Sequence, residues 1–304
     1  MTKAAVKTTG ENFTAEIYGV AKDNQIKIET DTLAVEEPLE IRLGISENGK
    51  LAHKAISITM RTPGSDAELA AGFLFTEGIL ESKNQIARIK HCGRFPANEN
   101  TIRVDLQANV RVNLKKLERN FYTTSSCGVC GKTSLEALAT GAKKISRNDY
   151  PKVAAKTIHQ LPEKLRESQT VFDQTGGLHA AALFDAKGNL IDLREDVGRH
   201  NAVDKLVGAQ FLKDALPLED LILFLSGRAS FELLQKAVMA RIPIVCAVGA
   251  PSSLAVAAAR EFDVTLLGFV RDKRFNIYNG RERIVGSEST LQRVFPPAKR
   301  GGTN

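Results

Sequence analysis

The sequence predicts an α/β protein with two domains. The first observation is length, because 304 residues are about twice the roughly 150 residues of an ordinary domain. The second is a change of pattern: the first half alternates polar and apolar residues, whereas the second half alternates apolar runs with helical periods. We expect an N-terminal α+β domain at 14–117, a flexible CxxC loop at 118–132, an α/β domain at 133–295 and a disordered tail at 296–304.

Five stretches of the N-terminal domain have the period-two alternation of strands: IKIET, LEIRLG, KAISITM, IARIKH and TIRVDL. A helix, ELAAGFLF, lies between the third and the fourth. Ser65 precedes this helix and Glu68 follows three residues later, which is the spacing of a capping box. We expect the apolar residues of the helix to pack on the sheet.

The second domain is expected to begin with a short helix, TSLEALAT, and a hairpin, AALFDAKGNLIDL, that turns at Lys187, Gly188 and Asn189. Helices and strands then alternate: NAVDKLVGAQFL, LILFL, FELLQKAVMA, IPIVCAV, SLAVAAAREF and VTLLGFV. Strands that are apolar throughout are typical of a sheet with both faces covered. The pattern therefore predicts a largely parallel sheet between two layers of helices.

Composition excludes several classes of protein and points to an anionic partner. With 43% hydrophobic and 25% charged residues, the chain is neither collagen-like, disordered nor a disulfide scaffold. Its net charge is +7, and residues 271–304 hold eight basic against three acidic side chains. A local basic excess favours nucleic acid, a membrane surface or a phosphorylated small molecule as the partner.

The chain lacks the marks of secretion or membrane insertion. Its first twenty residues contain no apolar signal segment, and no apolar run approaches the roughly 18 residues of a membrane span. Four cysteines are too few for a disulfide framework in a chain of this length. We therefore expect a cytoplasmic protein with no membrane contact.

The strongest chemical motif is SSCGVCGK, in which Cys127 and Cys130 form a CxxC. Lys132 and the positive end of the expected following helix favour the thiolate form, which is the nucleophile. A zinc site needs about four ligands, and the remaining cysteines, Cys92 and Cys246, are isolated in predicted strands and expected in the core. A redox dithiol remains plausible, although the motif lacks a surrounding βαβ unit. A loop that carries sulfur as a persulfide fits best.

Four further segments gather polar residues at the ends of predicted strands. TGGLHAAALF places His179 beside two glycines, although a lone histidine on a strand is more often structural. SGRAS, with Arg228, and GAPSS offer backbone N–H groups at helix N-termini, an arrangement that suits phosphate, although either segment alone fits simple helix capping equally well. GFVRDKRFNIY is expected to form two strands around a basic turn. The fourth, REDVGRHNAVDK, crowds seven polar residues at one helix entry, more than capping explains: Arg194, Glu195, Asp196, Arg199, His200, Asn201 and Asp204.

Taken in chain order, from RTPGSDAELAAGFLFTEGIL through SSCGVCGK to GFVRDKRFNIY, the motifs resemble those of the FdhD family of formate dehydrogenase accessory sulfurtransferases. The resemblance implies a protein that takes a persulfide sulfur from a cysteine desulfurase and passes it to the molybdenum cofactor, Mo-bis(molybdopterin guanine dinucleotide), for formate dehydrogenase. It also implies a homodimer, with Cys127 as the persulfide carrier and Cys130 as its partner. The cofactor, as bound substrate, would contact Phe269, Val270, Arg271, Asp272, Lys273 and Arg274.

The second half of the family is similar to the cytidine deaminase fold, and the predicted order of elements agrees with it. Deaminases hold zinc with an HxE at one helix start and a PCxxC at the next. Here His200 is followed by Asn201 and Ala202, and SGRAS contains no cysteine. We therefore expect a three-layer α/β domain that lacks the zinc site, and no structural metal.

Two other functions compete with sulfur transfer. A basic nucleotide- or nucleic-acid-binding protein without sulfur chemistry would use the C-terminal charges, but base stacking requires aromatic side chains among them. Only Phe275, Tyr278 and Phe295 are present there, so we expect no nucleic acid. A carrier that delivers the cofactor without sulfur chemistry would work without either CxxC cysteine.

Overall fold

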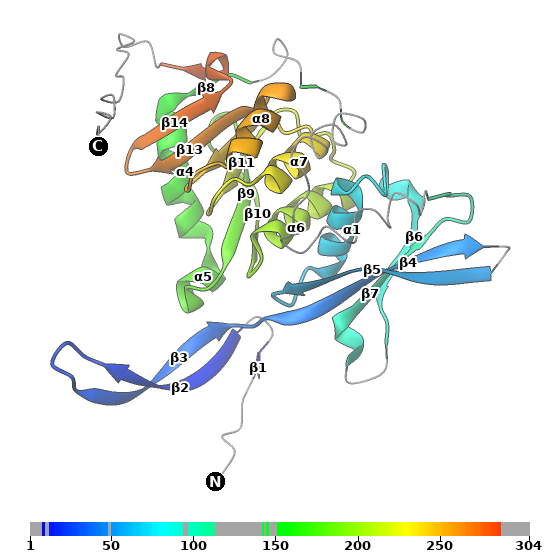
Figure 1. The fold of residues 1–304 in the computed structure, drawn as a ribbon, viewed down its shortest axis with the longest axis horizontal. Helices are drawn as coiled ribbons and strands as arrows, with labels where there is room; N and C mark the ends of the chain where they lie inside the picture. Colours follow the sequence, from blue (N-terminus) through cyan, green and yellow to red (C-terminus); the bar gives the residue numbers. More distant parts are fainter. Residues whose placement is uncertain are drawn as a thin grey trace, which may run out of the picture.

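The computed structural model describes residues 8–9, 12–47, 50–93, 97–112, 142, 144–145 and 151–286. Cys127 and Cys130, the helix expected at TSLEALAT and the expected C-terminal tail lie outside these residues. The described part contains an N-terminal sheet with its helix, a projecting hairpin and a larger sheet between helices (Figure 1).

The N-terminal sheet has four strands in the order β5-β4-β7-β6, and α1 packs against its inner face. All five predicted strands and the predicted helix are present. The first predicted stretch, IKIET, corresponds to β3, which lies outside this four-stranded sheet. The bounds are β4 (Glu37–Glu47), β5 (Lys50–Arg61), α1 (Asp66–Thr76), the 3-10 helix η1 (Lys83–Gln85), β6 (Ile86–His91), η2 (Ala97–Asn100) and β7 (Thr101–Leu106).

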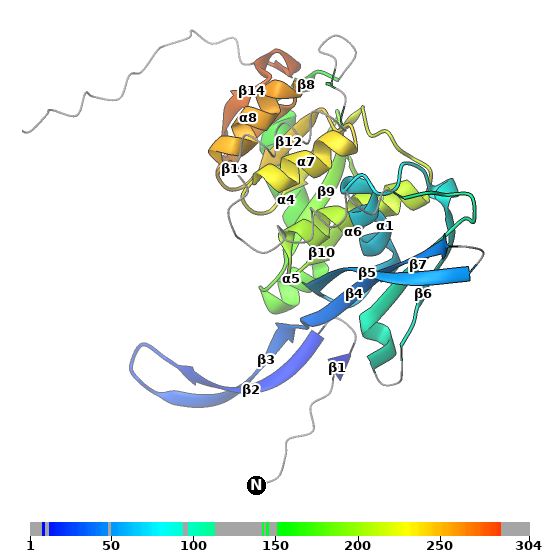
Figure 2. The ribbon, with the colours of Figure 1, turned by 45° about the vertical axis from the view of Figure 1, so that its right-hand side comes forward.

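A hairpin arm of β2 (Asn12–Val20) and β3 (Ile26–Ala34) projects from the body, with β1 (Thr8–Thr9) paired to the start of β2 (Figures 1 and 2). Strand β2 was not among the predicted strands. The base of the arm lies against α5 (Thr170–Thr175), where the Asn12 side chain donates to Gln174 at 2.5 Å. Tyr18 and Ile28 are opposed across the strands and about two-thirds exposed.

The larger sheet has six strands in the order β10-β9-β11-β12-β13-β14. Only β11–β12 and β12–β13 are parallel, so the expectation of a largely parallel sheet is wrong towards both edges. The physical reason is connection length, since hairpin turns at Gly188 and at Asp272 are too short for a parallel crossover. The bounds are β9 (His179–Asp185), β10 (Leu190–Asp196), β11 (Leu221–Leu225), β12 (Ile244–Ala247), β13 (Thr265–Arg271) and β14 (Arg274–Asn279).

Helices cover both faces of this sheet, as predicted (Figure 2). The helix α4 (Ala155–Ser168), with Pro162 inside, was not predicted; it lies between the expected helix at TSLEALAT and the expected hairpin. None of the helices in the described ranges is long and apolar enough to cross a membrane. One face of the sheet carries α6 (Arg199–Leu212), α7 (Phe231–Met239) and α8 (Ser253–Glu261). The other face carries α4 (Ala155–Ser168), and α5 (Thr170–Thr175) follows it in the chain. A separate pair of short strands is formed by β8 (Val153–Ala154) and β15 (Ile284–Val285), which comes directly after η3 (Arg281–Arg283).

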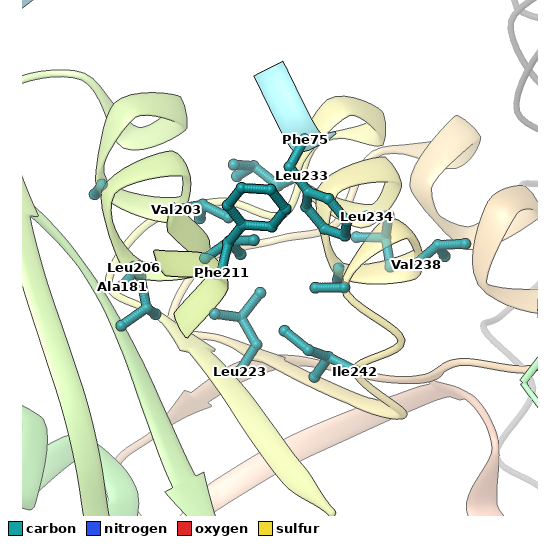
Figure 3. Close-up of a cluster of buried hydrophobic side chains, with 14 of the residues drawn as sticks. Phe75, Ala181, Val203, Leu206, Phe211, Leu223, Leu233, Leu234, Val238 and Ile242 are labelled. Carbon is teal, nitrogen blue, oxygen red and sulfur yellow. The ribbon is translucent and has the colours of Figure 1, made fainter. Parts of the chain in front are cut away.

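The N-terminal helix belongs to the same apolar core as α6, α7 and α8. Figure 3 shows Phe75 of α1 among side chains of α6 and α7, and its ring centroid lies 5.2 Å from that of Phe211. Buried residues of β4, such as Leu39, join this cluster from the N-terminal sheet. The position of α6, which begins at the edge of the larger sheet, is therefore fixed by packing from both halves of the chain.

The capping box predicted for α1 is wrong. Ser65 adopts a left-handed conformation, with φ of 54°, and its side chain makes no capping hydrogen bond. Glu68 is drawn away from the helix start by Arg194, whose guanidinium donates two hydrogen bonds to its carboxylate, at 2.6 and 2.9 Å. A partner from β10 thus replaces the local capping interaction.

Two glycines let α1 and α6 cross at close range. A Cβ on Gly208 of α6 would lie 1.8 Å from the carbonyl oxygen of Glu68, and one on Gly72 of α1 would lie 1.9 Å from that of Asp204. Backbone atoms cannot rotate away as side chains can. The helices must therefore move apart if either glycine gains a side chain.

We expect Gly208→Ala to lower the free energy of unfolding by about 2–3 kcal/mol, the cost of overpacking a tight contact. For a chain of this size, that corresponds to a melting temperature roughly 5–10 °C lower. Thermal unfolding followed by circular dichroism measures it. Gly177→Ala is the control, because its added Cβ meets the Cβ of Ala34 at an ordinary 3.5 Å. Equal melting temperatures for the two variants would contradict the steric argument.

Candidate functional site

The predicted ligand-binding segments meet at one edge of the six-stranded sheet. Strand β10 runs in the same direction as β11, β12 and β13, because β9 is antiparallel to both β10 and β11. The strands β10, β11 and β12 therefore end at the edge where α6, α7 and α8 begin. Backbone hydrogen bonds hold the loops side by side: Gly249 N–H donates to Gly227 at 2.9 Å, and Phe269 N–H donates to Gly249 at 3.1 Å.

The basic turn after β13 has a strained backbone. Asp272 and Lys273 form its two central residues, with φ of 51° and 55°, and Phe269 at the adjoining bulge has φ of 55°. Turns with positive φ at both positions normally use glycine or asparagine. Each such residue costs on the order of 1–3 kcal/mol, and strain of this kind concentrates at functional sites. The strain therefore marks this turn as a candidate binding element.

The side chains of the six predicted cofactor-binding residues do not all face the same way. Those of Arg271, Asp272, Lys273 and Arg274 are exposed. Phe269 is half-buried, whereas Val270 is fully buried in the cluster beneath α4, so only its backbone can approach a ligand. The structure thus offers three cations and one carboxylate at the tip of this hairpin.

Gly268 brings the basic turn close to the GAPSS segment. A Cβ at this position would lie 2.8 Å from Cδ of Pro251 and 2.9 Å from the Tyr278 ring. The segment is also fixed at the start of α8, where the Ser252 hydroxyl accepts from Ala255 N–H at 3.1 Å. The SGRAS segment is its neighbour, because Ala229 N–H donates to Ala250 at 3.2 Å.

Most of the polar cluster REDVGRHNAVDK has a structural role, which corrects the expectation that its density reflects ligand binding. Asp196 is completely buried. Its carboxylate accepts from the backbone N–H groups of Thr62 and Gly198, at 3.2 and 2.8 Å, and from Asn201 at 3.0 Å, and it pairs with Lys205 at 2.7 Å. This carboxylate joins the end of β5 to β10 and α6.

Three more members of the cluster have partners within the fold. Glu195 accepts from two backbone N–H groups at the start of α5, those of Val171 and Phe172, at 3.1 and 3.0 Å. Arg194 is held by Glu68, and Asp204 pairs with Lys236 at 2.9 Å. These side chains are held by partners within the fold, and Arg199 and His200, in the first turn of α6, are the charged or titratable members that remain.

His200 lies at the first turn of α6, with Nε2 3.3 Å from the Ser230 hydroxyl. Burial lowers its pKa to about 4, and the positive charges of Arg199 and Lys236 act in the same direction. His179, next to Gly227, also has a lowered pKa because of burial and Arg199. Both imidazoles are therefore neutral at pH 7, in a positive local potential that suits an anionic ligand.

The two cysteines outside the CxxC differ in burial. Cys246 lies in β12 and is fully buried, which raises the pKa of its thiol and confirms a place in the core. Cys92 directly follows β6 and is only partly buried, because its neighbours His91 and Gly93 are exposed at a sheet end. The described residues contain no group of three or more histidine, cysteine or carboxylate side chains that could hold a metal ion.

Comparisons with known proteins agree with the sequence motifs. The sequence profile of the FdhD/NarQ family matches residues 34–285. The sulfur carrier protein FdhD of Streptomyces coelicolor is 51% identical over 87% of this chain and 93% of its own, and that of Mycolicibacterium paratuberculosis is 52% identical over 84% and 92%. A crystal structure described as a formate dehydrogenase accessory protein from Desulfotalea psychrophila has the same fold, with a TM-score of 0.67 and 24% identity, covering 90% of this chain and 99% of that one.

Proposed function

Because the chain belongs to the FdhD/NarQ family and is about half identical to proteins named as sulfur carriers, we propose that it carries sulfur for formate dehydrogenase on Cys127. The single observation that supports this most is the CxxC between Ser126 and Gly131, whose surroundings favour a thiolate. The other two cysteines suit the role less well, since Cys246 is buried with a raised pKa.

The transfer has two balanced steps. The Cys127 thiolate attacks the outer sulfur of a cysteine desulfurase persulfide; a new S–S bond forms, the old one breaks, and the desulfurase cysteine leaves as a thiolate. The stored sulfur then passes to the molybdenum centre, and Cys127 is released as a thiolate. Cys130 would shield, resolve or relay the persulfide. No outside oxidant is needed in the first step, because the sulfur moves between two persulfides of the same oxidation level. In the second step the sulfur is reduced to the sulfide level, and the two electrons come from the acceptor, a reduced molybdenum centre.

The substrate that receives the sulfur is Mo-bis(molybdopterin guanine dinucleotide), and we propose that it binds at the edge of the larger sheet. The exposed cations of the turn at 271–274 suit its pyrophosphates, and the half-buried Phe269 lies beside them. The N-termini of α7 and α8 add positive potential. The molybdenum belongs to this cargo and not to a metal site of the chain.

The remaining partners follow from this role. A cysteine desulfurase supplies the sulfur and formate dehydrogenase receives the finished cofactor, and both exchanges belong in the reducing cytoplasm, where a persulfide-forming thiol stays reduced. A homodimer, which light scattering tests, completes the proposal. Nucleic acid is less well supported, because Phe275 packs against His159, with ring centroids 5.0 Å apart, and cannot stack on a base.

Guanosine diphosphate serves as a probe of the cofactor site. We expect Arg274→Ala to weaken its binding about tenfold, which is the worth of one charge-assisted hydrogen bond. Isothermal titration calorimetry measures the dissociation constant. Arg88→Ala is the matched control, because Arg88 is also exposed but lies on β6 of the other sheet. If both variants bind the nucleotide as wild type does, the site is not at this turn.

A further inference from the structure

The outer half of the hairpin arm has an apolar face that is exposed to water. Tyr18 and Val20 of β2 are paired with Ile28 and Ile26 of β3, so the four side chains lie on the same side of the hairpin. Each is between 65% and 68% exposed. Apolar side chains that are grouped in this way on a protein surface mark an interaction site. We call these four side chains the arm tip.

The arm receives little support from its own chain. At its base β3 packs against α5. The outer half projects away from the body in both ribbon views (Figures 1 and 2). A two-stranded hairpin alone is only marginally stable in water. A partner that covers the arm tip therefore buries its apolar face and also holds the hairpin in place.

A second apolar patch lies on the N-terminal sheet, beyond the base of the arm. Ile58 and Met60 of β5 are 70% and 47% exposed. They point away from the core, because Thr59 between them points inward and donates to Asn201 of α6 at 3.0 Å. Met60 is paired with Pro38 of β4, which is also exposed. We call Pro38, Ile58 and Met60 the sheet patch.

The distance between the arm tip and the sheet patch suits an exchange of arms between two copies of the chain. Strand β3 has nine residues, and these span about 30 Å at roughly 3.3 Å per residue. The arm tip lies at the start of this strand, and the sheet patch follows its end. When two arms run antiparallel about a twofold axis, the tip of each therefore reaches the base of the other. Both contacts form at once, as a closed symmetric dimer requires.

The apolar area fits a dimer of this kind. The arm tip, Ile58 and Met60 are six side chains that are between 47% and 70% exposed. At roughly 60–120 Å² for each fully buried side chain, one copy offers roughly 250–450 Å² of apolar surface. A stable complex buries about 800 Å² per partner, of which a little over half is apolar. Glu16, next to the arm tip, and the Glu40–Arg42 pair, next to the sheet patch, supply a polar rim.

We propose that the arm of each chain crosses to a second copy of the chain and packs its tip on the sheet patch of that copy. The proposal rests on the homodimer of the proposed function and assigns its contact surface. Pairing of the two arm tips with each other would leave the sheet patch exposed to water. Exchange of the arms covers both apolar surfaces.

Sedimentation equilibrium of the full chain measures the dissociation constant of the dimer. Ile28→Glu and, separately, Ile58→Glu each bury two carboxylates in the symmetric dimer, so we expect either variant to raise this constant at least about 100-fold. Ile28→Leu should dimerise as wild type does. The control is Ile191→Glu, which changes an isoleucine that is 50% exposed on β10 of the larger sheet and should leave the dimer intact.

A photocrosslink identifies the contact without a destabilising substitution. The photoreactive analogue p-benzoylphenylalanine replaces Tyr18, and this chain exchanges subunits with wild type that is labelled with nitrogen-15. We expect the arm to crosslink to residues 55–61, the tryptic peptide that contains Ile58 and Met60, in its labelled form. Crosslinks that contain only unlabelled peptide, or that join two arms, overturn the exchange.

The outcomes separate the arm contact from the proposed function. A monomeric wild type overturns both the homodimer and the exchange of arms, and sulfur transfer on Cys127 is decided by its own test. A wild-type dimer that neither glutamate variant weakens overturns the exchange alone. An unchanged dimer of Ile28→Glu, together with loss of formate dehydrogenase activity in cells, also overturns the exchange, because the arm then contacts a different protein.

Discussion

A Cys127→Ala variant will accept no sulfur from a cysteine desulfurase, and cells that contain only this variant will lose formate dehydrogenase activity. The side chain removed is the nucleophile of the proposed first step, and the methyl group of alanine cannot bind a sulfur atom. Intact mass spectrometry after incubation with a desulfurase and cysteine measures the first effect, as the absence of one added sulfur atom. Enzyme assays of cell extracts measure the second.

Two further cysteine variants make this test specific. Cys92→Ala is the control, because Cys92 is partly exposed but lies outside the motif, and it should load sulfur as wild type does. Cys130→Ala should still load sulfur and should transfer it less efficiently. Sulfur gained by Cys127→Ala as readily as by wild type would make the carrier assignment wrong. Full dehydrogenase activity without either cysteine would instead favour delivery of the cofactor without sulfur chemistry.

Local patterns predicted the elements of the fold well. The hairpin at Gly188, the helices α6, α7 and α8, and the strand, basic turn and strand around Asp272 all lie where the periodicity and the turn residues place them. Each of these depends on interactions within a few residues of sequence. The direction of the edge strands was wrong, because apolar runs indicate burial on both faces and not whether a strand is parallel.

The site shows where sequence alone is insufficient. Asp196 looks like a ligand-binding carboxylate at a helix entry, but one of its partners is the backbone of Thr62, which lies 134 residues earlier. Glu68 likewise leaves its predicted capping position for Arg194, 126 residues later. Long-range partners of this kind leave no periodic signal. The same holds for Phe269, whose positive φ arises from a bulge that only pairing with β14 creates.

Lys236 has a structural role that the sequence did not predict, although its position within the otherwise apolar stretch of the helix FELLQKAVMA indicated a buried charge. It is buried, with Nζ 2.9 Å from Asp204 of α6 and 3.1 Å from the Thr76 hydroxyl of α1. Burial alone would lower its pKa, but the carboxylates of Asp204 and Glu77 outweigh burial and raise it. The amine is therefore charged at pH 7 and ties α7 to both α6 and α1.

We expect Lys236→Met to lower the free energy of unfolding by about 3–5 kcal/mol at pH 7, because the Asp204 carboxylate is left buried without a cation. Denaturant unfolding at pH 7 and pH 5 measures the loss. Without the lysine, burial raises the pKa of the Asp204 carboxyl above its unfolded value. A raised folded-state pKa makes stability increase as the pH falls, so the deficit of the variant should shrink at pH 5.

An exposed ion pair is the control for the buried one. Lys213, also paired with an aspartate, is 60% exposed, and Lys213→Met should cost less than about 1 kcal/mol. The double variant Asp204→Leu with Lys236→Met should recover much of the loss, since apolar side chains of similar volume can replace a buried pair. If the double variant is less stable than Lys236→Met alone, the cost comes from lost packing and not from an unpaired charge. A deficit that stays constant between pH 7 and pH 5 would lead to the same conclusion.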